Sequence, residues 1–265
     1  LEVQALMQLL GRYLTQEITE MRQNQIAFQA IGDLTLLPRK VQQQVLEYID
    51  KSTGIQTLIQ MEALVGMVRE FGLVPPEKVL DRFGYKKLYK DALMERVNER
   101  TARLQSGQLD VSDFTVKGAV AFTRALRQRG VTLYLASGTD EPFVKQEAEL
   151  LDVARYFAGR IYGALDDYQN FSKKIVIDRI LRDNAIPGQR LLAFGDGYVE
   201  IENTKGAGGL AVAVASDEAH NGSGRMDPWK RQRLLGVGAD IVIPDFRDAA
   251  PLLDRIFGQR AGGTA

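Results

Sequence analysis

The sequence predicts an α/β protein, in which a doubly wound parallel sheet follows a helical domain. Two observations carry this prediction. Several runs in the C-terminal part, among them VTLYLAS and GLAVAVAS, are almost continuously apolar, which is typical of strands buried on both faces. Helical segments separate these runs, as in parallel strands joined by right-handed crossovers. We therefore expect residues 1–112 to form the helical domain and residues 113–265 the α/β core.

The helical domain shows no convincing strand. Apolar residues recur at three- and four-residue spacings in the segments 41–49, 55–72 and 85–105. Gly72 is expected to end one helix, and Pro75 and Pro76 to begin the next segment.

Helices and strands alternate in the core. In order, we expect a helix over 116–130, a strand over 131–137, a helix over 141–151, a short strand over 159–164, a helix over 173–185, a strand that runs into a loop over 189–197, strands over 209–216 and 239–246, and a helix over 248–258. Polar residues follow three of the strands, at Ser137, Asp196 and Asp245. In open parallel sheets, ligands bind at this carboxyl edge.

Composition excludes several classes of site. The formal net charge is zero, from 34 basic and 34 acidic residues, so we expect no nucleic acid or membrane partner. The chain has no cysteine and one histidine, which excludes cysteine and histidine-cluster metal sites. No apolar run is long enough for a membrane span, and no signal peptide is visible. We expect a cytoplasmic protein.

Three stretches at the strand ends indicate chemistry. Asp196 follows an apolar run directly and Glu200 lies four residues later, which suits Mg²⁺, a cation that prefers oxygen ligands. Gly195 and Gly197 would let the backbone turn tightly and approach the ion. The alternative is a Gly-Asp turn before a solvated acidic helix start.

Ser137, Gly138 and Thr139 offer a hydroxyl and free amides near a helix start, which is a cradle for phosphate. The alternative is that Thr139 or Asp140 caps the helix.

Lys173 and Lys174 begin a helix, where the helix dipole disfavours cations. Their position makes sense if one of them reaches an anion. The alternative is a solvated basic turn.

The order of these stretches resembles the haloacid dehalogenase (HAD) superfamily. The second motif of that family is matched by LYLASGT, the third by FSKKIVI and the fourth by FGDGYVE. The resemblance covers residues 113–258, and residues 1–112 resemble the helical cap of members such as phosphoglycolate phosphatase.

The resemblance implies a Mg²⁺-dependent phosphatase for a small phosphorylated metabolite, and a phosphomutase is an alternative. Ser137, with the Gly138 and Thr139 amides, would bind phosphoryl oxygens. Lys173 or Lys174 would offset the negative charge on the nucleophile and the phosphate. Asp196 would bind Mg²⁺, with Glu200 as a direct or water-mediated ligand.

The first motif of the family, an apolar strand ending in Asp-x-Asp-x-Thr, has no match before Ser137. The nearest imitation, AIGDLTLL, has a single aspartate, Asp33, which more readily begins a turn. We expect the chain to be truncated, with the attacking aspartate upstream of residue 1. The chain alone should then lack phosphatase activity and fold less well, because that strand would lie centrally. The alternative is a catalytically silent HAD-like module that binds phosphate or has a regulatory role.

Four other stretches have less specific patterns. Polar residues in 52–62 either select a leaving group or, as we favour, include a helix cap at Ser52 or Thr53. We interpret 217–220 as a surface loop, 225–235 as an exposed amphipathic helix and Asp245 as a helix cap.

Overall fold

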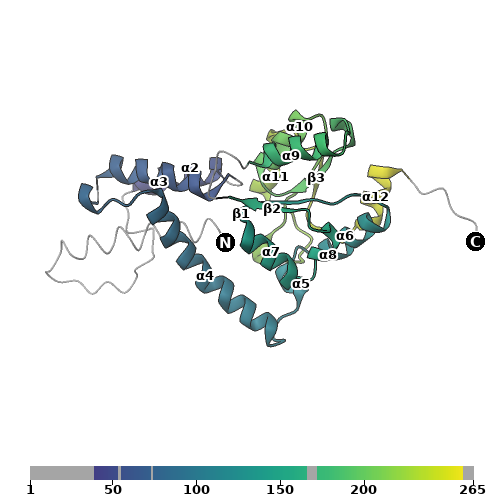
Figure 1. Ribbon diagram of the computed structural model, residues 1–265, viewed down its shortest axis with the longest axis horizontal. Coiled ribbons are helices and arrows are strands. Elements are labelled where there is room, and N and C mark those ends of the chain that lie inside the picture. The colour runs from purple at the N-terminus through teal and green to yellow at the C-terminus, as the bar shows by residue number, and fades with distance from the viewer. Residues whose placement is uncertain (1–38, 53–54, 73, 166–171, 259–265) are drawn as a thin grey trace, which may run out of the picture. The chain divides into compact units, whose positions relative to one another are not determined.

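The computed structural model describes residues 39–52, 55–72, 74–165 and 172–258. The chain consists of two compact units, Leu1–Gln108 and Leu109–Ala265. Their elements are labelled in Figure 1. That the first unit is a cap and the second a catalytic core stays a prediction.

The first unit is mainly helical in its described part. It contains α2 (Arg39–Ser52), α3 (Thr57–Phe71), a 3-10 turn (Pro76–Lys78) and α4 (Arg82–Gln105). Gly72 ends α3 with a φ of 62°, and its amide donates to the carbonyl of Val68, so this predicted helix end is confirmed. Asp81 begins α4 by accepting a hydrogen bond from the amide of Gly84 at 2.8 Å.

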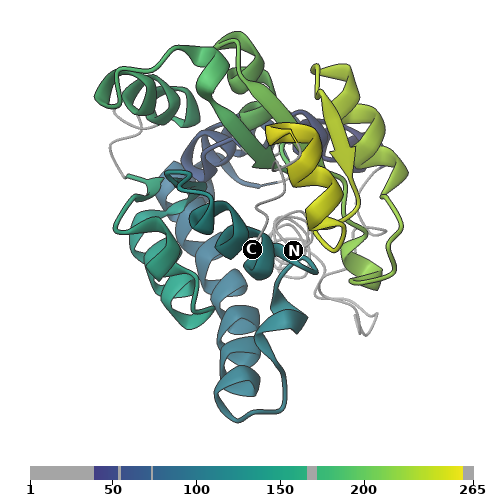
Figure 2. The ribbon, with the colours of Figure 1, turned by 90° about the vertical axis from the view of Figure 1, so that its right-hand side faces the viewer.

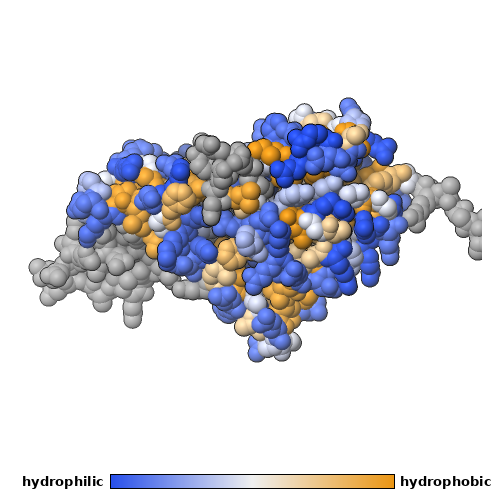
Figure 3. Space-filling model, in the orientation of Figure 1, coloured by the Kyte–Doolittle hydropathy of each residue, from blue (hydrophilic) through white to orange (hydrophobic). Residues whose placement is uncertain are grey.

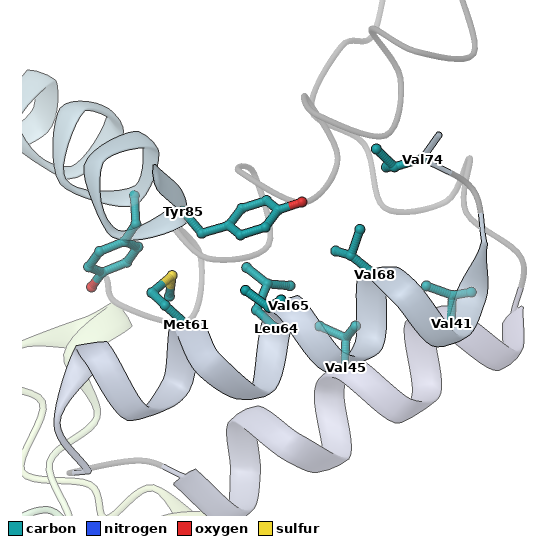
Figure 4. Packing of buried hydrophobic residues seen from close by; sticks show 9 residues of the cluster. Val41, Val45, Met61, Leu64, Val65, Val68, Val74 and Tyr85 are labelled. Carbon is teal, nitrogen blue, oxygen red and sulfur yellow. The ribbon is translucent and has the colours of Figure 1, made fainter. Parts of the chain in front are cut away.

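One hydrophobic cluster forms the core of the first unit. The buried residues of α3 recur at helical spacing: Leu58, Met61, Leu64, Val65 and Val68. Figure 4 shows four of them, Met61, Leu64, Val65 and Val68, with Val45 of α2 and Tyr85 of α4. Met61 is 0% and Tyr85 1% exposed. Full burial of an apolar side chain of this size contributes about 1.5–3 kcal/mol, so this cluster gives the first unit a core of its own.

The second unit alternates helices and strands in the predicted order. Its main elements are α5 (Val111–Phe114), α6 (Ala119–Gln128), β1 (Leu135–Asp140), α7 (Glu141–Leu150), α8 (Ala154–Phe157), β2 (Ile161–Ala164), α9 (Lys173–Asp183), β3 (Leu192–Gly195), α10 (Tyr198–Gly206), β4 (Leu210–Val214), α11 (Pro228–Gly236), β5 (Ile241–Ile243) and α12 (Ala249–Phe257). All pairs between these strands are parallel, which confirms the predicted fold class.

The strand β4 lies between β3 and β5 and is covered on both faces. Its residues Ala211–Val214 are at most 5% exposed. On one face, α10 and α11 pack with Ile201 and Leu234. On the other, α6 and α12 pack against side chains of β3 and β5, and Figure 2 shows α12 in yellow over the last strand. The interpretation of this apolar run as a doubly buried strand is confirmed.

The strands form two hydrogen-bonded groups, β1–β2 and β3–β4–β5, with no ladder between the groups in the described part of the chain. Hydrophobic clusters nevertheless connect them. Leu133, just before β1, lies in one cluster with Phe194 of β3. Leu191, just before β3, lies in another with Ala136 of β1. The two groups therefore share a hydrophobic core.

The first strand lies later in the chain than the sequence predicts. We expected a strand over 131–137, whereas β1 spans Leu135–Asp140. Pairing with β2 determines these bounds, and the register is irregular between Ala136 and Asp140. We expected Ser137 to end the strand and Gly138 and Thr139 to follow it. The segment Ser137–Thr139 instead lies within the irregular part of β1.

No described helix has the length and apolar character needed to cross a membrane. Hydrophobic and hydrophilic residues are interspersed on the face shown in Figure 3. Among the described residues, the large hydrophobic side chains that stay exposed are Ile59, Phe83, Leu165, Ile175, Trp229, Leu235 and Phe257.

Candidate functional site

The loop after β3 carries the two predicted metal acids. Asp196 and Gly197 form the turn, and α10 follows with Glu200 in its first turn. Oε1 of Glu200 accepts a hydrogen bond from the Gly197 amide at 2.9 Å. This bond satisfies one of the amides that a helix start leaves without an intrahelical partner. Glu200 is thus tied back to the loop that carries Asp196.

The second oxygen of Glu200 is bound by Lys173. The distance from Nζ of Lys173 to Oε2 of Glu200 is 2.7 Å, and the two side chains are 13% and 15% exposed. Lys173 is the first residue of α9, which Ser172 begins by accepting a hydrogen bond from the Ile175 amide at 3.1 Å. A charge-assisted bond in this partly buried setting is stronger than an ordinary surface pair.

Lys174 has a different environment. Its Nζ lies 2.7 Å from Oδ2 of Asp178, one turn along α9, and both side chains are more than half exposed. The sequence left open which lysine faces the acids. The structure brings Lys173 to Glu200 and leaves Lys174 in a surface pair.

Gly195 and Gly197 make room for the Glu200 carboxylate. A Cβ atom on Gly195 would lie 2.4 Å from Cγ of Glu200, and one on Gly197 would lie 2.7 Å from its Oε2. Both distances are shorter than van der Waals contact, so a side chain on either glycine would force Glu200 to move. We expected these glycines to permit a tight turn near an ion, but the described geometry requires them for the approach of Glu200.

Asp196 has a partner that we did not expect. Nζ of Lys230 lies 3.7 Å from Oδ2 of Asp196. Lys230 belongs to α11, which the sequence predicts as an exposed amphipathic helix, yet its side chain is only 16% exposed. Nothing in the local pattern around residue 230 points to Asp196. The contact depends on how α11 packs against the sheet and α10.

The segment Ser137–Thr139 lies on the strand next to α9. Oγ of Ser137 accepts a hydrogen bond from the Thr139 amide at 3.2 Å. Asp140 precedes α7 as its N-cap residue without a side-chain cap bond, so the capping alternative for Asp140 is wrong. The helix α9 packs on β1, since Val176 and Ile180 share a cluster with Ala136. Ser137 and Lys173 therefore come from adjacent elements.

The arrangement after β3 fits one divalent cation on a small number of carboxylates. Asp196 is 59% exposed and stands at the end of a buried strand. Mg²⁺ is commonly held by one or two carboxylates, with water and substrate phosphate as the other ligands. Within the described residues, no group of three or more acidic or histidine side chains could hold a metal ion. Asp196 is thus the candidate ligand, while Glu200 is engaged by Lys173 and Gly197.

Other sequence candidates form local contacts. Asp245 accepts from the Arg247 amide at 2.9 Å and pairs with its guanidinium at 2.7 Å, whereas Asp248 is the N-cap of α12. Burial alone would raise the pKa of Asp245, but the bonds from Arg247 outweigh it and hold the pKa below its usual value. The predicted cap role of Asp245 is therefore wrong.

Asp217 and Ser52 also form contacts close to their own position in the chain. Asp217 pairs with His220 at 3.1 Å in the loop after β4. Ser52 ends α2 and accepts a bond from Gln60 at 2.9 Å through its carbonyl, so it does not cap α3. Asp33, the weak candidate for the nucleophile, lies outside the described residues.

Comparisons with known proteins agree with this architecture. Residues 35–208 match the family model described as "Hydrolase: haloacid dehalogenase-like hydrolase". No curated protein is significantly similar to this chain in sequence. A predicted phosphatase from Clostridium acetobutylicum is a similar solved structure, with 14% identity, a TM-score of 0.53, and coverage of 96% of this chain and 92% of that chain.

A second similar structure is a conserved haloacid dehalogenase-like protein of unknown function from Agrobacterium tumefaciens. It is 15% identical, with a TM-score of 0.51, and the match covers 96% of this chain and 93% of that chain. At this level of identity, both structures support the fold.

Proposed function

The chain belongs to the haloacid dehalogenase-like hydrolases, and from this membership we propose that it is a phosphatase that hydrolyses a small phosphate monoester with Mg²⁺. The observation that carries the proposal is the Lys173–Glu200 ion pair beside Asp196 at the end of β3. Phosphoryl transfer depends mainly on positioning and on stabilisation of charge. An ordered lysine beside an exposed carboxylate at the carboxyl edge of a parallel sheet supplies both.

Each residue has a role in this proposal. The Ser137 hydroxyl and the Gly138 amide donate to phosphoryl oxygens, and the Thr139 amide does so after it leaves Oγ of Ser137, to which it donates at 3.2 Å. Lys173 offsets negative charge on the phosphate and the nucleophile, and Glu200 orients its ammonium group. Mg²⁺ on Asp196 would neutralise charge that develops on the phosphoryl group.

The attacking group is a further part of the proposal. No Asp-x-Asp sequence occurs before Ser137. We therefore place the aspartate that forms a phosphoaspartyl intermediate upstream of residue 1. Residues 1–112 would form the cap that limits the size of the substrate.

The test is release of inorganic phosphate from a panel of phosphate monoesters. The polypeptide as the native source makes it and the 265-residue chain are compared, with Mg²⁺ and with EDTA. We expect turnover only by a longer native polypeptide and only with Mg²⁺. In that protein, Lys173→Met should lower kcat/KM at least about tenfold more than Lys174→Met, because Lys173 contacts the acids. Turnover that is indifferent to Mg²⁺ and to Asp196→Asn would contradict the proposal.

One observation favours a second function, a silent module that binds phosphate. Both predicted metal acids have a lysine partner within 4 Å, Glu200 at 2.7 Å and Asp196 at 3.7 Å, so their charge is balanced without metal. Such a module would bind inorganic phosphate in titration calorimetry, yet release none from any ester even as the native polypeptide. The same two assays therefore separate the two functions.

A further inference from the structure

Lys230 lies beside Asp196, and little of its side chain is exposed. Its side chain is 16% exposed, although Asp196 itself is 59% exposed. By comparison, Lys174 in its surface pair is 67% exposed. A lysine ammonium is strongly hydrated and normally extends into water on its flexible stem. The low exposure of Lys230 therefore indicates that the fold holds its side chain inward.

The start of α11 determines where Lys230 lies. Asp227 caps the helix by accepting a bond from the Lys230 amide at 2.9 Å. The amide of Asp227 donates to the carbonyl of Ala215, just beyond β4, at 2.9 Å. The first turn of α11 is thus tied to the carboxyl end of the central strand.

The rest of α11 is docked on α10, the helix that follows the Asp196 turn. Leu234 is 0% exposed and shares a cluster with Ile201 of α10. The guanidinium of Arg233 lies 4.8 Å from the ring centre of Tyr198 and 5.0 Å from that of Trp229. Lys230 is therefore positioned by the packing of its helix, and the ion pair with Asp196 is a consequence.

We propose that Lys230 is a positioning residue that competes with a divalent cation for Asp196 and so sets the metal affinity of the site. The inference rests on the proposed function, because it takes Asp196 as the metal ligand. A cation bound by Asp196 would lie within a few ångströms of the ammonium group, and like charges at such distances repel. Metal binding therefore requires Lys230 to withdraw and to give up its ion pair.

The measurement is the dissociation constant for Mg²⁺, obtained by titration calorimetry. It is made on the polypeptide as the native source makes it and on the 265-residue chain. A partly exposed ion pair together with repulsion of a bound cation corresponds to about a threefold to tenfold change in affinity. Lys230→Gln should bind Mg²⁺ tighter by about that factor. Lys230→Arg, which keeps the charge, should stay close to wild type.

The matched control is Arg231→Gln. Arg231 is exposed on the same helix, so this variant removes the same charge one residue away from the pair. It should change the Mg²⁺ affinity by less than about twofold. Should Lys230→Gln bind Mg²⁺ no tighter than Arg231→Gln, the inference is overturned. Circular dichroism melting verifies folding, and Lys230→Met replaces Lys230→Gln if the latter is unfolded.

Asp196→Asn separates failure of the inference from failure of the proposed function. If this variant binds Mg²⁺ as wild type does, or if wild type binds none, Asp196 is not the ligand and both fail. If Asp196→Asn loses Mg²⁺ while Lys230→Gln is unchanged, the metal site stands and only the role of Lys230 is refuted.

Discussion

Lys173→Met and Glu200→Gln, alone and combined, test how strongly the partly buried ion pair holds α9 to the loop after β3. Glutamine keeps the Oε1 acceptor that binds the Gly197 amide at 2.9 Å, so the change at Glu200 removes mainly the charge. Methionine keeps the apolar stem of Lys173. The double variant isolates the interaction between the two side chains.

The expected magnitude follows from the burial of the pair. Exposed pairs contribute about 0.2–1 kcal/mol, whereas removal of one partner from a fully buried pair costs about 3–5 kcal/mol. The Lys173–Glu200 pair is 13% and 15% exposed, at an N–O distance of 2.7 Å. We therefore expect a coupling energy of about 1–3 kcal/mol.

Urea unfolding of the four proteins gives the coupling energy from their free energies of unfolding. The Lys174–Asp178 pair is the internal standard, because it has the same 2.7 Å distance but exposed fractions of 67% and 54%. Its cycle should give about 0.3–0.5 kcal/mol. Equal coupling energies for the two pairs would refute the reasoning from burial.

Three further predictions concern other contacts. Gly195→Ala should abolish the Glu200 contact and lower the free energy of unfolding by about 1–3 kcal/mol, because the new Cβ would lie 2.4 Å from Cγ of Glu200; thermal melting checks this. Asp240 accepts a bond from the Ala211 amide at 2.8 Å and another from Lys205 at 2.7 Å. Burial alone would raise the pKa of Asp240, but these two bonds lower it below its usual value. The stabilisation by Asp240 is therefore present above the unfolded pKa and is lost as the pH falls through the lower folded pKa. The difference in stability between wild type and Asp240→Asn should thus be constant above about pH 5 and shrink below about pH 4. Met61→Ala should destabilise the first unit by about 2–5 kcal/mol in urea unfolding, since Met61 is 0% exposed, and a loss below about 1 kcal/mol would show that the site collapses around the cavity.

The elements that local pattern determines could be predicted from the sequence. The helix expected over 173–185 is α9, and the one expected over 248–258 is α12. Both have apolar faces at helical spacing, with cap or stop residues beside them. The short strand expected over 159–164 is β2. In each case the signal lies within the segment itself.

Features that depend on a partner strand or helix could not be predicted. The bounds of β1 follow from its register with β2, which its own apolar run does not encode. The contact of Lys230 with Asp196 joins residues far apart in the chain and requires the docked position of α11. The sequence predicts Gly195 and Gly197 where a strand runs into a loop, and Gly195 does end β3, but only the position of Glu200 explains why a Cβ atom on either glycine would lie too close.

The stacking of Arg233 on Trp229 gives this protein a built-in optical reporter. The chain contains a single tryptophan, so all indole fluorescence originates from α11. The ring is 48% exposed, which makes its emission accessible to soluble quenchers such as iodide. Any event that shifts α11 against α10 would change the surroundings of this ring. Emission wavelength and quenching of the unmodified chain can therefore follow, without an added label, whether this helix stays docked when an ion or a phosphate is titrated in.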